Sequence, residues 1–404
     1  MKFQIKLHWQ ILMGIILGIV FGIVFPNIVP YFEWIGIIFI NALKMIVVPL
    51  ILTSIVSGIS SIGNSSYLGR LSFKTILYYL FTSLLALFTG LFFVNLFHPG
   101  APGILNIPVG NGIETEKSLI DTLVGIIPTN IFEAFQNNNH MLSIIFLAML
   151  FGIFITKLKD KSRILLQNIF DSLFELMMKI TMFIMRFAPL GIFALIAQSV
   201  SNQDNIGLLM QSLGKFTVTC LLALTFHFFI TLPVLLLIFA RINPLKHFRA
   251  MIIPLLTAFS TASSNATLPL TIQEIENKSK VSNKISSFTL PLGATINMDG
   301  TALYELVVAI FIAQALGIEL SFIKQFIIIT TALLASIGTA GIPMASYTTM
   351  AIIFTAIGLP IETIAIVLPV DRILDMCRTA TNVWSDTCCT VIIAKSEKED
   401  IYTD

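Results

Sequence analysis

Long, nearly uninterrupted apolar runs recur along the 404-residue chain, at 11–29, 76–96, 142–155, 221–240 and 326–335. An α-helix needs about 20 apolar residues to cross the hydrocarbon core of a membrane, so these runs and their flanks predict spanning helices, on the order of eight to ten. The runs are continuous rather than alternating, which argues against a β-barrel. The pattern therefore predicts an all-α polytopic membrane protein.

Two apolar segments of the C-terminal half are interrupted by small and helix-breaking residues, at 257–269 and 335–346. Their apolar flanks of roughly 10–14 residues are too short for full spans, and ordinary Gly/Ser-rich loops would not need such flanks. We expect two re-entrant hairpins, because irregular backbone is tolerated at membrane depth where protein surrounds it. A helix with polar groups follows each hairpin, and paired broken segments of this kind indicate the midplane site of a transporter.

Composition narrows the class further. Apolar residues make up 56% and charged residues only 11% of the chain, against about 25% charged in soluble domains. These values disfavour a soluble enzyme, a disordered protein and a nucleic-acid binder. Lys and Arg total 24 and Asp and Glu 22, so no basic excess indicates a polyanionic partner. The 4 cysteines and 5 histidines form no spaced framework, so no disulfide, zinc site or other cofactor is expected.

Basic clusters predict the orientation, because cytoplasmic loops carry an excess of Lys and Arg. They occur at 2–6, 70–74, 157–163, 241–249 and 395–398, and spans paired between them place both termini in the cytoplasm. The first apolar run is too long for a signal peptide and lacks a cleavage site, so we expect it to be retained. The polar stretch 99–139 is expected to be extracellular.

The first apolar run also contains Gly14, Gly18 and Gly22, which form two overlapping GxxxG spacings. Small residues at this spacing let two helices approach closely. Two partners fit the pattern equally well: a second copy of the chain, or a neighbouring helix of the same chain.

A polar stripe runs along the last helix, formed by Asp371, Asp375, Arg378, Asn382 and Asp386. At 100° per residue their directions fall within about 80° of one another. A charge at the bilayer centre costs several kcal/mol, so these groups are expected to face one another and a polar cavity. A purely structural ion-pair network is the weaker alternative, because three carboxylates face one guanidinium and the excess negative charge favours a bound cation.

The types of side chain in the stripe suggest their roles. The planar fork of Arg378 matches a carboxylate in bidentate fashion. Asp375 lies three residues away on the same face and can accept hydrogen bonds from an ammonium group, so the pair suits an α-amino acid. Asn382 and Asp386 supply oxygen atoms, which hard cations prefer, and carbonyls of an unwound helix would complete a sodium shell.

Two further segments contain oxygen ligands. Residues 293–301 place Asn, Asp and Gly inside an apolar span, where these poor helix formers predict local unwinding. Tyr79, Thr82 and Ser83 have i, i+3, i+4 spacing and share one helix face. Their three hydroxyl groups could close an oxygen shell around Asp299, although hydroxyls on one face usually bond the preceding turn.

Residues 297–301 read Asn-Met-Asp-Gly-Thr, which is similar to the signature of the glutamate transporter family, the dicarboxylate/amino acid:cation symporters. The resemblance runs over nearly the whole chain and includes the serine-rich tip 263–269, the second tip 336–343, and residues 375–382 together with Asp386. It implies eight transmembrane helices, two opposed re-entrant hairpins in inverted repeats, a homotrimer in the cell (inner) membrane and an elevator movement. The chain would form one transporter unit, with a scaffold and trimerisation part at about 1–68 and 118–200 and a transport part at about 69–98 and 206–395.

The resemblance also implies site residues. The substrate would contact both tips and two helices, through Ser263, Ser264, Thr301, Gly341, Ile342, Ser346, Asp375, Arg378, Thr379 and Asn382. Three sets of oxygen and sulfur ligands would hold sodium: Gly293, Asn297, Asn382 and Asp386; Thr295, Met298, Ser336, Ile337 and Thr339; and Tyr79, Thr82, Ser83, Asn297 and Asp299.

The chain departs from the family pattern at several positions. Ala262 stands where many prokaryotic members carry Arg, and Met376 where eukaryotic members carry Arg, although Arg372 lies nearby. The second tip reads Pro-Met-Ala-Ser at 343–346 instead of a Pro-Gly-Ala-Gly-like sequence, and Asn265 replaces a common Ser. These differences put the fit of the substrate and the closure of the second tip in doubt.

Within the family, Arg378 favours a substrate with a second carboxylate, since neutral amino acid members lack this Arg. Asp375 disfavours C4-dicarboxylates, which have no ammonium group. We therefore expect a sodium-coupled symporter of L-glutamate or L-aspartate, because the three ligand sets are complete. A proton-coupled glutamate or C4-dicarboxylate symporter is the alternative. An ion channel would not need the Arg/Asp pair, and an intramembrane enzyme would need more than Ser263 and Ser264 without a nearby His.

Overall fold

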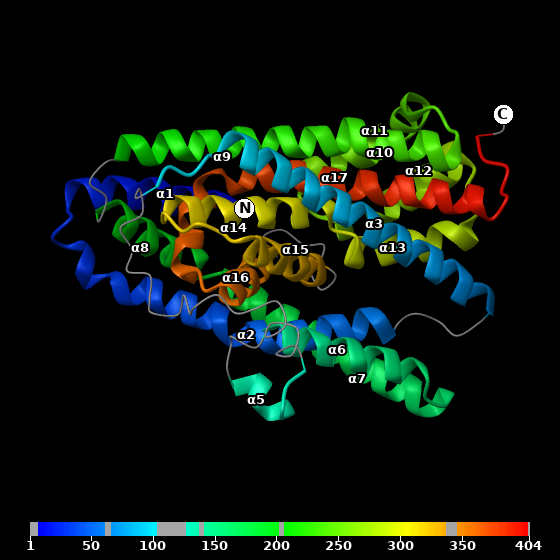
Figure 1. Ribbon diagram of the computed structural model, residues 1–404, viewed down its shortest axis with the longest axis horizontal. Coiled ribbons are helices and arrows are strands. Elements are labelled where there is room, and N and C mark those ends of the chain that lie inside the picture. Colours follow the sequence, from blue (N-terminus) through cyan, green and yellow to red (C-terminus); the bar gives the residue numbers. More distant parts are fainter. Residues whose placement is uncertain are drawn as a thin grey trace, which may run out of the picture.

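The computed structural model describes residues 7–60, 66–102, 127–136, 141–201, 206–336 and 346–402, and all regular structure in these ranges is helical (Figure 1). The first half contains α1 (Leu7–Val24), α2 (Glu33–Ser60), α3 (Ser66–Phe97), α5 (Ile131–Gln136), α6 (Met141–Thr156), α7 (Asp160–Met185) and α8 (Ala188–Ser201). The second half contains α9 (Ile206–Phe226), α10 (Leu232–Leu235), α11 (Pro244–Thr261), α12 (Ser264–Ser279), α13 (Asn283–Ile296), α14 (Asp299–Ala315), α15 (Phe322–Ser336), α16 (Ser346–Ile357) and α17 (Leu368–Ser396).

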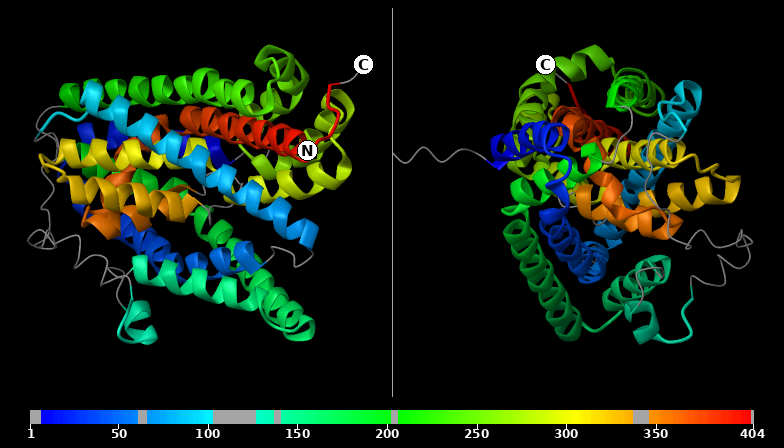
Figure 2. Two further views of the ribbon diagram at one scale, coloured as in Figure 1. Left: turned by 45° about the vertical axis from the view of Figure 1, so that its right-hand side comes forward. Right: turned by 90° about the vertical axis from the view of Figure 1, so that its left-hand side faces the viewer.

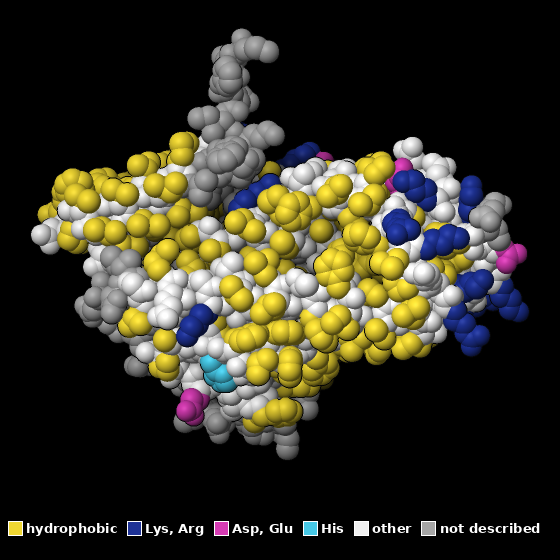
Figure 3. All heavy atoms as spheres, turned by 90° about the horizontal axis from the view of Figure 1, so that it is seen from above, with side chains coloured by type: hydrophobic (Ala, Val, Ile, Leu, Met, Phe, Trp, Pro, Cys, Tyr) yellow, Lys and Arg dark blue, Asp and Glu magenta, His cyan; other side chains and the backbone are white. Residues whose placement is uncertain are grey.

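Within the part of the chain that the structure describes, three helical stretches are long and apolar enough to cross a membrane, at Arg70–Phe97, Gly207–Ala240 and Asn283–Ala315. The bent pair α7 and α8 adds a fourth if it is counted as one span. Large apolar side chains are exposed over much of the surface (Figure 3). In the described ranges, the all-helical class and the apolar surface agree with the expected membrane protein, and the number of eight spans stays a prediction.

The glycines of α1 pack against α8 of the same chain. A Cβ atom added to Gly14 would lie 2.5 Å from the carbonyl oxygen of Pro189, and one added to Gly22 would lie 2.7 Å from that of Ala197. Backbones can approach this closely only where side chains are absent. Of the two partners expected for the GxxxG face, the structure therefore shows the neighbouring helix.

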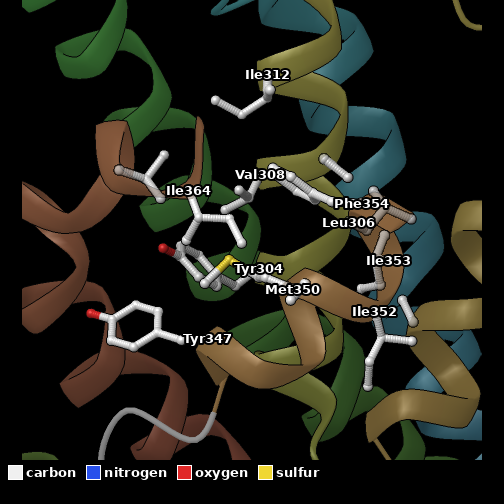
Figure 4. Packing of buried hydrophobic residues seen from close by; sticks show 14 of the residues in the cluster. Tyr304, Leu306, Val308, Ile312, Tyr347, Met350, Ile352, Ile353, Phe354 and Ile364 are labelled. Carbon is white, nitrogen blue, oxygen red and sulfur yellow. The ribbon is translucent and has the colours of Figure 1, made fainter. Parts of the chain in front are cut away.

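Helices α1, α2, α6, α7 and α8 pack mainly on one another, whereas α3 packs on helices of the second half, where α14 lies at the centre. Helix α2 contacts α6, α7 and α8, whereas α14 contacts α3, α15 and α17. Nearly every residue of α14 is buried, and Figure 4 shows its Tyr304 and Val308 beside Met350 of α16. An apolar helix that is covered on all sides is typical of the interior of a helical bundle.

The first expected hairpin is formed by α11 and α12, which lie side by side (Figures 1 and 2). The side chain of Asn243 caps the start of α11 by accepting a hydrogen bond from the Leu245 amide at 2.9 Å. Helix α11 ends at Thr261, and the next residue, Ala262, has a left-handed φ of 51°. The hydroxyl of Ser263 then caps α12 by accepting from the Ala266 amide at 3.2 Å. Both helices are longer than the apolar flanks expected, with 18 and 16 residues, because their outer turns are polar.

The second expected hairpin is formed by α15 and α16, with 15 and 12 residues, which also contact one another. Its tip, 337–345, lies outside the described residues. Helices α11 and α12 lie toward the end of the molecule that holds the C-terminus, and α15 and α16 lie nearer to the opposite end (Figure 1). The positions of the two helical pairs agree with opposed hairpins.

Candidate substrate and sodium sites

The polar stripe of α17 faces the interior, as its periodicity predicts. Asp371 and Arg378 are each 1% exposed, Asn382 and Asp386 are each 3% exposed, and Asp375 is 8% exposed. Helix α17 packs between α11, α13 and α14, which carry the other polar segments. The stripe therefore forms one wall of a buried polar region.

Arg378 makes few of the hydrogen bonds that its side chain can donate. Its Nη2 atom lies 2.9 Å from Oδ1 of Asp375 and 3.1 Å from Oδ1 of Asp371. Its guanidinium carbon lies 3.9 Å from the centre of the Tyr304 ring, a cation–π distance. Its Nε and Nη1 atoms are buried and make no hydrogen bond to any described residue. These two donors on one edge of the fork can hold a carboxylate in bidentate fashion.

Two buried acceptors, one on α17 and one on α16, are also unused within the described residues. Oδ2 of Asp375 is buried and accepts no hydrogen bond from the described residues, although Nη1 of Arg372 lies 3.7 Å away. The hydroxyl of Ser346, at the start of α16, is likewise buried without a hydrogen bond in the ranges that the structure describes. Unsatisfied buried polar atoms are costly. Unused donors of Arg378 beside an unused acceptor of Asp375 are typical of a ligand site.

The remaining expected substrate residues are placed as follows. Thr301 of α14 accepts a hydrogen bond from the Asn382 amide at 3.2 Å, and the Thr379 hydroxyl donates to the Asp375 carbonyl at 2.8 Å. Ser263 and Ser264 are buried at the first tip, where α12 contacts α17. The expected residues Gly341 and Ile342 lie outside the described residues. Their roles stay predictions.

Helix α13 ends at Ile296 and α14 begins at Asp299, so the predicted unwinding between them is confirmed. The break lets the Asn297 amide donate to Oδ1 of Asp386 at 2.8 Å. A Cβ atom added to Gly293 would collide with the Asp386 carboxylate and lie 2.6 Å from the Tyr79 hydroxyl. Gly293, Asn297 and Asp386 therefore meet, as expected for the first sodium set. The fourth member, Asn382, instead accepts a hydrogen bond from the Gly300 amide at 2.8 Å.

The hydroxyl face of α3 meets the broken helix. Ser83 donates to Oδ1 of Asp299 at 2.6 Å, and Thr82 lies 3.4 Å from the side-chain oxygen of Asn297. Tyr79 donates to the Thr289 carbonyl at 2.9 Å. The structure thus brings oxygen atoms of α3, Asn297 and Asp299 together, which is the arrangement a hard cation requires.

The other sodium set is less assembled. The hydroxyl of Thr295 bonds the Leu292 carbonyl at 3.0 Å and that of Ser336 bonds the Leu333 carbonyl at 2.8 Å, both within their own helices. The sulfur of Met298 accepts a hydrogen bond from Asn382 at 3.2 Å. Ile337 and Thr339 lie outside the described residues. This set stays a prediction.

Several buried polar residues of the region were not selected from the sequence. Tyr304 and Glu305 follow Thr301 by one helical turn, and this i+3, i+4 spacing is a signal that could have found them. Glu305 accepts a hydrogen bond from Thr349, and the Tyr347 hydroxyl donates to Asp371 at 2.7 Å. No spacing rule predicts the two α16 partners, because they come from a different helix.

Comparison with known proteins fits this geometry. A model of the sodium:dicarboxylate symporter family matches residues 7–396. The chain is 35% identical over 406 residues to a proton/sodium-glutamate symport protein of Geobacillus stearothermophilus, which covers 98% of the chain and 95% of that protein. It is 35% identical to the neutral amino acid transporter B(0) of Bos taurus, over 93% of the chain and 75% of that protein. It is 33% identical to excitatory amino acid transporter 3 of Mus musculus, over 92% of the chain and 80% of that protein. The chain belongs to the sodium:dicarboxylate symporter family.

Proposed function

We propose that the protein is a secondary active symporter that couples uptake of L-glutamate or L-aspartate to inward sodium movement. The observation that supports this most is the pair formed by Arg378 and Asp375. They offer two unused donors and one unused acceptor oxygen within one turn of a buried helix. A second carboxylate on the substrate suits the guanidinium, and an α-ammonium suits Asp375.

Relatives of the chain include both acidic and neutral amino acid transporters. Arg378 favours the acidic class, because its buried Nε and Nη1 donors stay without partners when the ligand brings no second carboxylate. Asp375 favours an amino acid over a C4-dicarboxylate, because only the amino acid has an ammonium group that can donate to its carboxylate. The substrate roles of Ser263, Ser264, Thr301, Ser346, Thr379 and Asn382, and of Gly341 and Ile342, belong to this proposal.

Sodium coupling is supported by the oxygen atoms that meet at the break between α13 and α14. Asp299 and Asp386 lie in one hydrogen-bonded cluster through Asn297 and Ser385. Two buried carboxylates without a basic Lys or Arg in that cluster favour a bound cation. We place sodium there and assign the Thr295, Met298 and Ser336 set to a further ion that binds when the second tip closes.

The proposal includes the family architecture: eight transmembrane helices, two opposed hairpins, a homotrimer and an elevator movement of the transport part at about 69–98 and 206–395. The charge distribution supports the orientation. Exposed basic side chains gather at the end of the molecule that holds the C-terminus (Figures 1 and 3). Near this terminus Arg70 and Lys74 pair with Glu397, and Lys246 donates to the Tyr402 carbonyl. This end is the proposed cytoplasmic end.

Proton coupling is the second candidate, and Glu305 favours it. This carboxyl group is 0% exposed, and its Oε2 atom makes no hydrogen bond to the described residues. A carboxyl group in such a place can carry a proton during the transport cycle. In that case uptake would depend on external pH in the wild type and lose this dependence in Glu305→Gln.

Uptake of labelled aspartate and glutamate into proteoliposomes tests the proposal. Separate arms impose a sodium gradient, a proton gradient, or neither, and unlabelled succinate and alanine compete for uptake. We expect saturable uptake that requires sodium and is inhibited by the acidic amino acids. Uptake driven by the proton gradient alone would favour the second candidate, and a conductance that does not saturate with amino acid would favour a channel.

A further inference from the structure

Helix α9 does not continue as a regular α-helix beyond Phe226. A π-helical turn, η3 (His227–Thr231), follows it, and α10 begins after this turn. Single π-helical turns occur frequently at functional sites because they change the direction in which side chains project. Here the turn places His227 at 0% exposure inside the bundle.

The π-helical turn is attached to α17 at two neighbouring points. The indole of Trp384 donates a hydrogen bond to the Phe228 carbonyl at 3.0 Å, and the rings of Trp384 and Phe228 stack. The residues next to this pair, His227 before Phe228 and Ser385 after Trp384, reach the same atom. Nε2 of His227 lies 3.3 Å from Oδ2 of Asp299, and the Ser385 hydroxyl donates to that oxygen at 2.6 Å.

The two oxygens of Asp299 therefore have different surroundings. Oδ2 faces His227 and Ser385, whereas the Ser83 hydroxyl is the only hydrogen-bond partner of Oδ1 among the described residues. A hydroxyl group can rotate and offer a lone pair instead of a proton. Oδ1 and the Ser83 oxygen can then bind one cation together, while Oδ2 stays held.

We propose that His227 is a positioning residue of the sodium site at Asp299. It donates from Nε2 to Oδ2 and so orients Oδ1 toward Ser83, Thr82 and Asn297. The inference rests on the proposed sodium coupling and adds a residue that is not itself a sodium ligand. Residues that hold a metal ligand by hydrogen bonds commonly change metal affinity by roughly 10- to 100-fold when they are replaced.

The chain offers a matched pair of variants and a control. The amide nitrogen of Gln can occupy the place of Nε2, whereas the shorter Asn reaches only the place of Nδ1, which makes no hydrogen bond to the described residues. His247 is also 0% exposed but bonds the Tyr402 hydroxyl at 2.5 Å instead of Asp299. His247→Leu therefore controls for the loss of a buried histidine.

The experiment measures L-aspartate binding to the purified full-length protein by calorimetry over a series of sodium concentrations. We expect His227→Leu and His227→Asn to need roughly 10- to 100-fold more sodium for half-maximal binding, and to bind aspartate normally once sodium saturates. His227→Gln and His247→Leu should keep the sodium dependence of the wild type.

A purely structural role would weaken aspartate binding even at saturating sodium and would lower thermal stability in sodium-free buffer. If His227→Leu does not fold, the comparison of His227→Gln with His227→Asn still tests whether His227 orients Asp299. Equal sodium dependence in these two variants, or an unchanged one in His227→Leu, would overturn the inference and leave the proposed function intact. If the affinity of the wild type for aspartate does not depend on sodium, the proposed function would be overturned instead.

Discussion

The guanidinium carbon of Arg378 lies 3.9 Å from the centre of the Tyr304 ring, which comes from the neighbouring helix α14. The ring covers one face of the guanidinium. Asp375 and Asp371 both form ion pairs with the Nη2 atom of Arg378. A cation between a π face and two carboxylates is held firmly, because each contact restricts it in a different direction. The edge formed by Nε and Nη1 is thereby presented to a ligand.

Replacement of Arg378 by Cys should abolish uptake of aspartate and glutamate and let small neutral amino acids compete better for binding. Loss of one partner of a buried charged pair costs roughly 2–5 kcal/mol of binding free energy. Equilibrium binding on the purified variant measures the change. The control is Arg372→Cys, which removes a partly exposed arginine 3.7 Å from Asp375 and should have a smaller effect. Normal aspartate uptake by Arg378→Cys would show that Arg378 does not bind the substrate.

Replacement of Asp375 by Asn should weaken amino acid binding by roughly 2–5 kcal/mol and weaken any binding of succinate much less. The reason is that only the amino acid has an ammonium group to meet the Asp375 carboxylate. Competition of both ligands against labelled aspartate, in wild type and variant, gives the two losses. An equal loss for both ligands would mean that Asp375 acts mainly by holding Arg378.

Replacement of Asp386 by Asn should raise the sodium concentration for half-maximal aspartate binding by at least roughly tenfold, while the elution volume in size-exclusion chromatography stays that of the wild type. The variant keeps a side chain that can bond Asn297 but loses the charge that favours sodium. Coupling between two ligands is reciprocal, so aspartate must tighten sodium binding by the factor by which sodium tightens aspartate.

The same coupling predicts an electrical signature. If two or three sodium ions accompany one anionic amino acid, one or two positive charges cross per cycle, each contributing about 2.3 kcal/mol per 100 mV. An inside-negative potential imposed on proteoliposomes should therefore accelerate uptake. Aspartate affinity that is constant from sodium-free buffer to saturating sodium would contradict sodium coupling and favour the proton-coupled alternative.

Glu397, just beyond the end of α17, predicts a dependence of stability on pH. A hydrogen bond from Lys74 at 2.6 Å and another from Arg70 at 2.8 Å hold the pKa of Glu397 below its ordinary value. A lowered pKa means that the contribution to stability is complete above the unfolded-state pKa of about 4.3. It is lost as pH falls through the lower, folded-state pKa.

At pH 7, Glu397→Gln should therefore unfold at a lower temperature than the wild type. The loss in free energy of unfolding should be no more than about 1 kcal/mol, and the difference should vanish in acid. Thermal unfolding across the pH range from neutral to acid measures it. Lys74→Gln should show the same pH window, because it removes the other side of the contact. A difference that persists in acid would indicate that Glu397 acts through packing.

Local patterns in the amino-acid sequence were enough to predict the helical class and the main polar face. Apolar runs of span length exclude most soluble folds, and the 3.6-residue period fixes which side chains of α17 share a face whatever surrounds the helix. Poor helix formers at 297–301 indicated the break between α13 and α14 for a similarly local reason. The break and the buried stripe both depend on neighbours in sequence, so both could be predicted.

No local pattern predicted which side chains from distant parts of the chain contact one another. Ser83 and Asp299 are 216 residues apart in the sequence, and His227 and Asp299 are 72 residues apart. The helix that packs on the α1 glycines is a similar case. The GxxxG spacing predicts that a helix approaches closely, but it does not predict which helix. A local pattern fixes the direction of a side chain from its own helix, whereas its partner depends on how all the helices pack together.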